Sequence, residues 1–395
     1  MTFDDERRHA VVLSGGGGYG AYEIGVLRAL LSGESASTGY RAVDPAVVTG
    51  TSAGAFNAAL LCSSPVGTDA MTALDYVEDV WLNAITGDEY CGNNVLRFRG
   101  DLSTLLHPEC AATPVAIAEL SADAAYLNEQ FNARLARFVD ASENLEQRVL
   151  DALDASVFVS SDRFAAVIGE TVALDHVRQS ERQLRIAATN WRTGELRTFA
   201  NADMSDRWGH RIVLGSAAIP GVFETVEIEG EPYADGGMVM NTPLSPAIAA
   251  GADDIHVIYM DPHVDQIPLP RLRSTASTMY RFAVIAQAAM MERDIEIATS
   301  INRGIDIAEG RVAVNMTRSD ARARHLLVAR LAEPGAPNYR RLSIHRYHPH
   351  DDPGGTFRWF SFDRDRIVRM MDRGYEDARR HDCSERDCLL AEGER

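Results

Sequence analysis

Two glycine-rich turns constrain the fold of this chain more than any other feature of its sequence. The first, Ser14 to Gly20, joins the valine-rich run Ala10 to Leu13 to a helical pattern of apolar residues from Ala21 to Leu31. The second, Gly50 to Gly54, lies between a shorter apolar run and a helix of small residues. Strands that lead through tight turns into helices build parallel sheets covered by helices. We therefore predict an α/β fold, a three-layer sandwich with a mainly parallel central sheet.

The second turn, Gly50-Thr51-Ser52-Ala53-Gly54, fits the pattern G-x-S-x-G. Its glycines let the chain turn sharply, so Ser52 should stand on an exposed elbow at the N-terminus of the following helix. The partial positive charge of that helix end favours the negative charge that develops on a substrate oxygen during acyl transfer. Short glycine–serine patterns also arise by chance, but this position makes Ser52 the candidate nucleophile.

The first turn exposes consecutive backbone N–H groups, which suits the binding of an anion. Three of its glycines also match the dinucleotide fingerprint G-x-G-x-x-G. That fingerprint requires an acidic residue after the second strand, whereas Asp44 precedes that strand. An oxyanion hole is therefore the better interpretation, and we expect no cofactor. The candidate glycines of the hole are Gly15, Gly16, Gly17, Gly18 and Gly20.

A third element, Tyr233-Ala234-Asp235-Gly236-Gly237, is followed closely by Asn241-Thr242-Pro243. An acidic residue before two glycines is usually only a turn. Together with the glycine loop and Ser52, in this order and spacing, it resembles the patatin-like phospholipase family. The resemblance runs from about residue 9 to residue 261. It includes Ala188-Thr189-Asn190 with Thr193-Gly194-Glu195, and Ser216-Ala217-Ala218-Ile219-Pro220 before Phe223.

The resemblance implies a Ser–Asp dyad that hydrolyses acyl esters of lipids through an acyl-enzyme. Ser52 would be the nucleophile, Asp235 the general base, and the glycine loop the oxyanion hole. The motif glycines would be Gly50, Gly54, Gly236 and Gly237. One position departs from the family, because Tyr19 stands where the family usually has Arg or Lys. A phenol carries no positive charge, so activity or headgroup preference is expected to differ if that cation contributes.

Two other functions on the same fold stay open. One is a soluble carboxylesterase or thioesterase, because no membrane-binding segment is evident. The other is a catalytically silent lipid- or protein-binding module. Labelling of Ser52 by a fluorophosphonate would separate the hydrolases from the silent module.

The histidines offer an alternative to the dyad and a possible metal cluster. The order serine–acid–histidine of α/β-hydrolases would allow a histidine after Asp235, and His263 is best placed for that role. Nothing around His263 resembles a histidine loop, so we prefer the dyad. His345, His348 and His350 resemble a metal cluster, but alternation along a strand more often only exposes histidines. The five cysteines lack CxxC spacing, and we assign no metal.

Composition narrows the class of partner. The 395 residues include 57 Asp and Glu against 39 basic residues, all Arg, for a formal net charge of −18. Nucleic acid and anionic membranes should repel this charge, so we expect no nucleic-acid partner. Residues 1–9 hold no apolar signal segment, and the cysteine number is odd. We expect a cytoplasmic protein with at most peripheral membrane contact. The sequence leaves its oligomeric state unknown.

The chain is expected to divide near residue 262. Residues 8–262 would form the catalytic domain, with a mostly helical cap inserted at about 65–165. Residues 263–395 would form a C-terminal helical extension packed on the core, with helices over about Ser274 to Ile301 and Asp363 to Arg380. The polar tail after about residue 381 is expected to fray.

Overall fold

The computed structural model describes residues 7–87, 95–100, 114–139, 158–260, 275–308, 340–350 and 360–390. At its centre is an eight-stranded sheet in the order β10-β9-β1-β2-β5-β8-β7, with β6 also paired to β5. Its strands are β1 (His9–Leu13), β2 (Val47–Thr51), β5 (Gln183–Asn190), β6 (Leu196–Ala200), β7 (Val226–Ile228), β8 (Glu231–Asp235), β9 (Asp254–Ile258) and β10 (Ser343–Tyr347). A separate pair joins β3 (Arg97–Phe98) to β4 (Val159–Ser160).

The sheet is parallel on one side and antiparallel on the other. Strands β10, β9, β1, β2 and β5 run parallel, whereas β6, β7 and β8 form antiparallel pairs. Parallel strands are covered on both faces and therefore have continuous apolar sequences, as in the fully buried run Ala10 to Leu13. The predicted α/β fold with a mainly parallel sheet is confirmed.

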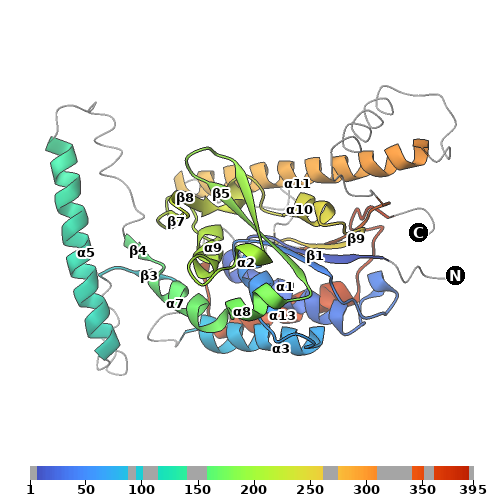
Figure 1. Ribbon diagram of the computed structural model, residues 1–395, viewed down its shortest axis with the longest axis horizontal. Coiled ribbons are helices and arrows are strands. Elements are labelled where there is room, and N and C mark those ends of the chain that lie inside the picture. The colour runs from blue at the N-terminus through green and yellow to red at the C-terminus, as the bar shows by residue number, and fades with distance from the viewer. Residues whose placement is uncertain are drawn as a thin grey trace.

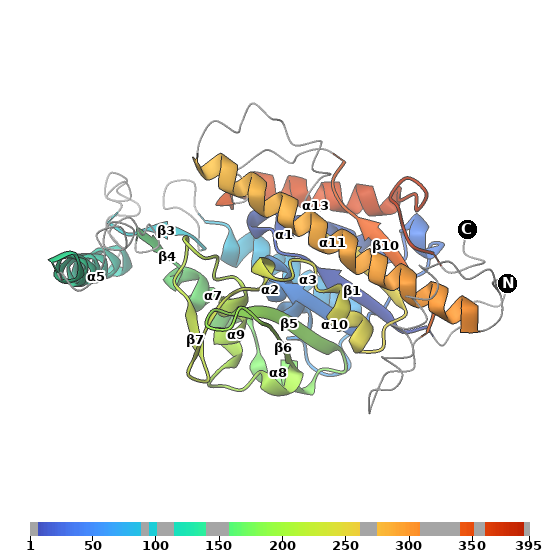
Figure 2. The same cartoon turned by 90° about the horizontal axis from the view of Figure 1, so that it is seen from above.

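Helices cover both faces of the sheet (Figures 1 and 2). They include α1 (Gly20–Leu31), α2 (Ala53–Leu61), α3 (Ala70–Val80), α7 (Asp162–Thr171), α8 (Leu174–Gln179), α9 (Gly209–Ser216), α10 (Leu244–Ala249), α11 (Thr275–Ala308) and α13 (Arg364–Arg379). Successive side chains of β1 point to opposite faces: Val11 and Leu13 belong to one core cluster, and Ala10 and Val12 to the other. The first cluster packs under α1, α2, α3 and α13, and the second under α10 and α11.

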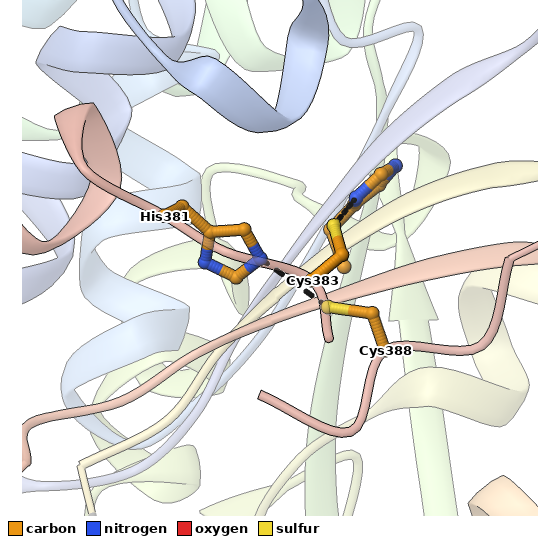
Figure 3. A group of neighbouring side chains, drawn as sticks. His381, Cys383 and Cys388 are labelled. Atoms are coloured by element: carbon orange, nitrogen blue, oxygen red, sulfur yellow. Dashed lines mark hydrogen bonds between the residues drawn. The ribbon is translucent and has the colours of Figure 1, made fainter. Parts of the chain in front are cut away.

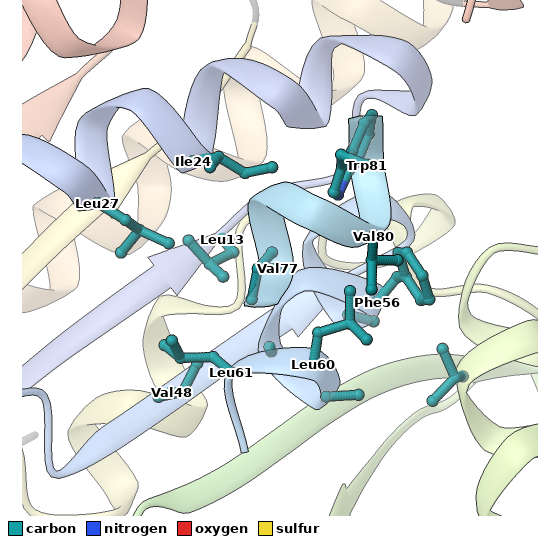
Figure 4. Close-up of a cluster of buried hydrophobic side chains, with 14 of the residues drawn as sticks. Leu13, Ile24, Leu27, Val48, Phe56, Leu60, Leu61, Val77, Val80 and Trp81 are labelled. Atoms are coloured by element: carbon teal, nitrogen blue, oxygen red, sulfur yellow. The ribbon is translucent and has the colours of Figure 1, made fainter. Parts of the chain in front are cut away.

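The larger cluster fixes the two helices that follow the glycine-rich turns (Figure 4). Leu13 of β1, Ile24 and Leu27 of α1 and Leu60 of α2 are fully buried there. Each such side chain stabilises the fold by about 1.5–3 kcal/mol. This packing therefore holds in place the N-termini of α1 and α2, where predicted site residues lie.

The chain beyond residue 262 contributes directly to the core. Strand β10 adds to the sheet edge beside β9, and α13 packs closely across α1. A Cβ atom on Gly25 would lie 1.9 Å from the carbonyl oxygen of Met371, and one on Gly374 would lie 2.1 Å from that of Tyr22. Glycines on both helices therefore let the two backbones approach each other.

The expectation that the tail frays after about residue 381 is wrong for residues 381–390. Leu389 exchanges two backbone hydrogen bonds with Ile344 of β10, and its N–H lies 3.0 Å from the Ile344 carbonyl oxygen. An edge strand has unpaired N–H and C=O groups, and the returning chain satisfies some of those of β10.

The region expected to form a cap is divided between the core and a separate helix. Leu74 and Val77 of α3 belong to the larger core cluster, so α3 is part of a helical layer. Helix α5 (Pro114–Val139) instead stands at one end of the molecule (Figure 1). We therefore restrict the proposed cap to the surroundings of α5. Within the described ranges, no helix is both long and apolar enough to span a membrane.

Candidate active site

Ser52 lies in the tight turn between β2 and α2, at the position that the motif predicts. Its backbone angles are φ 55° and ψ −120°, a conformation that costs a residue with a side chain about 1–3 kcal/mol. A Cβ atom on Gly50 would lie 2.2 Å from the Gly54 carbonyl oxygen, and one on Gly54 would lie 2.3 Å from that of Leu13. These two motif glycines therefore let the elbow close against β1.

Strand β5 brings Asp235 to Ser52. Ala187 on β5 is in register with Thr51 at the end of β2, and the next residue, Ala188, is in register with Asp235 at the end of β8. Strands β2 and β8 thus end against the same stretch of β5, and Ser52 directly follows Thr51. The Ser52 side chain lies close enough to the Asp235 carboxyl to lower its pKa. The two residues predicted to form a dyad therefore lie together.

The carboxyl group of Asp235 is buried, with 6% of its residue surface exposed. Burial raises the pKa of Asp235 from 3.8 to about 6, although the Gly237 N–H and the Ser52 side chain act in the opposite direction. The Gly237 N–H donates to Oδ1 at 2.7 Å. The group is thus mostly ionised at neutral pH and is a stronger base than an exposed aspartate.

The loop that follows Asp235 braces the glycine-rich turn. The Gly15 N–H donates to the Asn241 carbonyl oxygen at 3.1 Å, and Asn241 Nδ2 donates to the Gly15 carbonyl oxygen at 3.2 Å. The motif glycines leave room for this loop: a Cβ atom on Gly236 would lie 2.4 Å from the Ala187 carbonyl oxygen, and one on Gly237 would lie 2.8 Å from Asn241 Oδ1. The predicted glycine loop, elbow and acidic segment therefore form one site.

Two glycines of the predicted oxyanion hole use their N–H groups elsewhere. The Gly15 N–H bonds to Asn241, and the Gly20 N–H donates to the Gly17 carbonyl oxygen, because the chain there closes into a 3-10 turn that leads into α1. The prediction is corrected for these two residues. Gly15 has a steric role instead, since a Cβ atom on it would lie 3.0 Å from the Ser52 Cβ atom.

The other three glycines stay candidates for the oxyanion hole. The 3-10 turn spans Gly17–Tyr19, with Gly16 at its N-terminal cap. Residues at the start of a helical turn have no partner for their N–H groups within that turn, so Gly16, Gly17 and Gly18 can offer theirs to an anion. Gly17 has φ 56° and lines the same pocket as Ser52.

Ser216 fixes the elbow through a contact that sequence reasoning missed. Its hydroxyl accepts the Ser52 N–H at 3.0 Å and donates to the Ala187 carbonyl oxygen at 2.7 Å. The Ser52 N–H is therefore engaged with Ser216. In the sequence, Ser216 drew attention only as part of the family resemblance, because the partner of a buried hydroxyl leaves no local pattern.

A second buried network, also missed, lies behind the glycine loop. Asn57 Nδ2 donates to Glu23 at 2.8 Å and to the Gly20 carbonyl oxygen at 3.0 Å, and Trp81 Nε1 donates to Asn57 Oδ1 at 2.6 Å. Burial raises the pKa of Glu23 well above its ordinary value, although the hydrogen bond from Asn57 acts in the opposite direction. The network holds the start of α1 to α2.

An apolar pocket opens beside Ser52, with a volume of about 490 Å³ that includes the part open to solvent. Ala217 and Ile219, which follow Ser216, contribute to its wall. Its aromatic lining residues are Phe56, Trp81, Phe164, Phe223, Phe360 and Phe362. A wall of this kind suits an extended apolar group whose polar end lies at Ser52.

Tyr19, the departure from the family pattern, is buried against the C-terminal extension. The guanidinium carbon of Arg366 on α13 lies 5.0 Å from the centroid of the Tyr19 ring. A cation over an aromatic face stabilises the pair by about 0.5–2 kcal/mol. Helix α13 therefore places a cation beside the position where the family usually carries its own.

The histidines considered as alternatives do not complete a triad within the described residues. His263 lies outside those residues. His256 and His345 are stacked on β9 and β10 with ring centroids 4.9 Å apart, and their partners are Tyr347 and Asp254 rather than the dyad. His345 and His348 are buried, contrary to the expectation that strand alternation exposes them.

Comparison with known proteins places this chain in a family. A family model described as Patatin-like phospholipase matches residues 11–248, which is more than half of the chain. No curated protein matches the sequence at a significant level. Among solved structures, VipD from Legionella pneumophila is similar, with a TM-score of 0.36 and 16% identity. The match covers 94% of this chain and 66% of the VipD chain, just under two thirds of it. The chain belongs to the patatin-like phospholipase family.

Proposed function

We propose that this protein is a lipid acyl hydrolase of the phospholipase A type, which cleaves acyl esters through a Ser52–Asp235 dyad. The observation that carries the proposal is the pairing of the Ser52 side chain with the buried Asp235 carboxyl at an apolar pocket, with Ser52 on a strained elbow. A serine hydroxyl is a weak nucleophile until a neighbouring base accepts its proton. Asp235, whose pKa burial raises to about 6, is that base.

In the first half of the reaction, Asp235 accepts the proton of the Ser52 hydroxyl while Oγ forms a bond to the acyl carbon. The carbonyl oxygen becomes an oxyanion, which the N–H groups of Gly16 to Gly18 and the N-terminus of α2 stabilise. When this intermediate collapses, the ester C–O bond breaks and Asp235 returns the proton to the leaving alcohol. The acyl group remains on Ser52.

In the second half, a water molecule attacks the acyl carbon. Asp235 accepts a proton from this water and then gives it to Ser52 Oγ as the acyl-enzyme bond breaks. The products are a fatty acid and the free serine. The apolar pocket supports a fatty acyl chain as the group that lies beside Ser52 during both steps.

The test is labelling with a fluorophosphonate probe, with the modified residue identified by mass spectrometry, together with hydrolysis of phosphatidylcholine. Ser52→Ala is expected to abolish labelling and to reduce turnover at least about a thousandfold. Ser63→Ala is the matched control, because Ser63 is a buried serine just beyond the other end of α2. It should label normally.

Two outcomes would replace the proposal with another function. Unlabelled wild-type protein that still binds phospholipid would indicate a silent binding module. Labelled protein that cleaves short soluble esters, but not long-chain esters, would indicate a carboxylesterase or thioesterase. Full turnover by folded Ser52→Ala would exclude the dyad altogether.

A further inference from the structure

Four potential metal ligands meet at the edge of the sheet beside β10. One lies on β10, and the other three come from the chain that leaves α13 and returns to β10 (Figure 3). We call them the four-ligand cluster: His345, His381, Cys383 and Cys388. Their two ring nitrogens and two sulfurs all lie within 4.8 Å of one another. Both cysteines are outside any disulfide.

The spacing of the donor atoms is close to that around a tetrahedral ion. His345 Nδ1 lies 3.3 Å from Cys383 Sγ, and His381 Nε2 lies 3.2 Å from Cys388 Sγ. Zinc bonds of about 2.3 Å to sulfur and about 2.0 Å to nitrogen place neighbouring ligand atoms about 3.3–3.8 Å apart. The widest pair, at no more than 4.8 Å, needs a shift of about 1 Å to share an ion, which side-chain rotation can supply.

The surroundings orient these ligands as the neighbours of a metal site do. His345 Nε2 lies 3.4 Å from Asp254 Oδ1, which leaves Nδ1 directed at Cys383. A carboxylate on the far nitrogen of a ligating histidine is a recurrent feature of zinc sites. The backbone N–H of Arg346 donates to Cys388 Sγ at 3.3 Å.

We propose that the four-ligand cluster binds a structural zinc ion that fastens the C-terminal segment to β10. Two sulfurs and two imidazoles form a donor set that selects zinc over magnesium or calcium. Four protein ligands close the coordination shell and leave no position for a substrate. The cluster is also separated from β2 by β9 and β1, about 14 Å of sheet, so the ion takes no part in the chemistry at Ser52.

This proposal departs from the expectation, drawn from the sequence, that the chain binds no metal. The sequence pattern did not indicate this site, because one ligand lies on a strand and the other three follow a helix that is distant in the chain. Zinc would join β10 to the segment that follows α13. Helix α13 packs on α1, which begins directly after the glycine loop. The ion would therefore stabilise the layer that supports the active site.

The experiment uses the full chain, purified under reducing conditions and supplied with zinc. After gel filtration, elemental analysis is expected to show stoichiometric zinc. Replacing zinc with cobalt should give the intense visible absorption of a tetrahedral ion and the charge-transfer bands of cobalt–thiolate bonds. Removing the ion should lower the melting temperature, and adding zinc back should restore it. Turnover per folded molecule should be unchanged.

Cys388→Ser should lose the zinc, the cobalt–thiolate bands and the melting response. Cys62→Ala is the matched control, because Cys62 is a buried cysteine of the larger core cluster. Its replacement should leave all three properties intact. Wild-type protein that takes up no zinc and shows no cobalt–thiolate bands would overturn the proposal. So would a Cys383–Cys388 disulfide in the reduced, zinc-supplied protein. Because these measurements do not depend on hydrolysis, they stand apart from the test of the Ser52–Asp235 dyad.

Discussion

At the scale of a single residue, the burial that makes Asp235 a stronger base also has a cost in stability. Burial raises its pKa from 3.8 to about 6, so the folded state binds the proton more tightly than the unfolded state does. The resulting stabilisation is complete below about pH 4 and is lost as the pH rises through about 6. At pH 7.5 the ionised group therefore lowers the free energy of unfolding by about 3 kcal/mol.

Asp235→Asn should remove this cost, because an amide stays neutral and its oxygen can still accept the Gly237 N–H. We expect an inactive variant that is more stable than the wild type by up to about 3 kcal/mol at pH 7.5, with no difference near pH 4. Denaturant unfolding at both pH values measures this. A variant that is less stable than the wild type at pH 7.5 would contradict the raised pKa.

The raised pKa of Asp235 also sets the expected pH–rate profile. Ionisation of Asp235 should give kcat/KM an acidic limb near pH 6. A histidine base would give a limb at about 6.5, so the profile alone does not separate a dyad from a triad.

In the proposed mechanism, Ser216 acts through the backbone of Ser52. Ser216→Ala leaves the buried Ser52 N–H without its acceptor, which costs about 1–3 kcal/mol of stability. It also frees the strained elbow to relax, so we expect kcat to fall at least about tenfold while KM changes little. Steady-state kinetics and the rate of fluorophosphonate labelling measure the effect. An unchanged kcat in a less stable protein would assign Ser216 a purely structural role.

At the scale of elements, the crossing of α1 and α13 positions the start of α1 and thus the glycine loop. Gly25→Ala would place a methyl group 1.9 Å from the Met371 carbonyl oxygen, a backbone atom that cannot turn away. We expect a loss of at least about 1–3 kcal/mol. Gly169→Ala in α7 is the control, because a Cβ atom there meets nothing within 4 Å, and it should stabilise by up to about 1 kcal/mol. Thermal unfolding of both variants tests the crossing, and equal melting temperatures would argue against it.

Elements with a strong local pattern could be predicted from the sequence, and contacts between distant segments could not. The apolar run before Ser14 and the G-x-S-x-G turn indicated β1 and the Ser52 elbow through residues adjacent in the chain. The register that places Asp235 beside Ser52 depends on pairing with β5, and only the family resemblance pointed to it. The bond from Ser216 and the return of residues 381–390 to β10 are long-range contacts of the same kind.

At the scale of the whole molecule, the net charge of −18 opposes approach to an anionic surface. This repulsion extends about 30 Å at 0.01 M ionic strength but only about 8 Å at 0.15 M. We therefore expect slower hydrolysis of phosphatidylcholine vesicles when they contain phosphatidylglycerol, with the difference largest at low salt and narrowing as salt is added. Initial rates of fatty-acid release across a salt series measure this.

A neutral, soluble short-chain ester is the control, because it reaches Ser52 without approaching a charged surface. Its hydrolysis should not depend on salt, so any salt dependence with vesicles reports on the surface and not on the dyad. If vesicles with phosphatidylglycerol were hydrolysed faster at low salt, the net charge would not govern the encounter. A local group of arginines would then have to face the membrane, and replacing those arginines with glutamine would remove the preference.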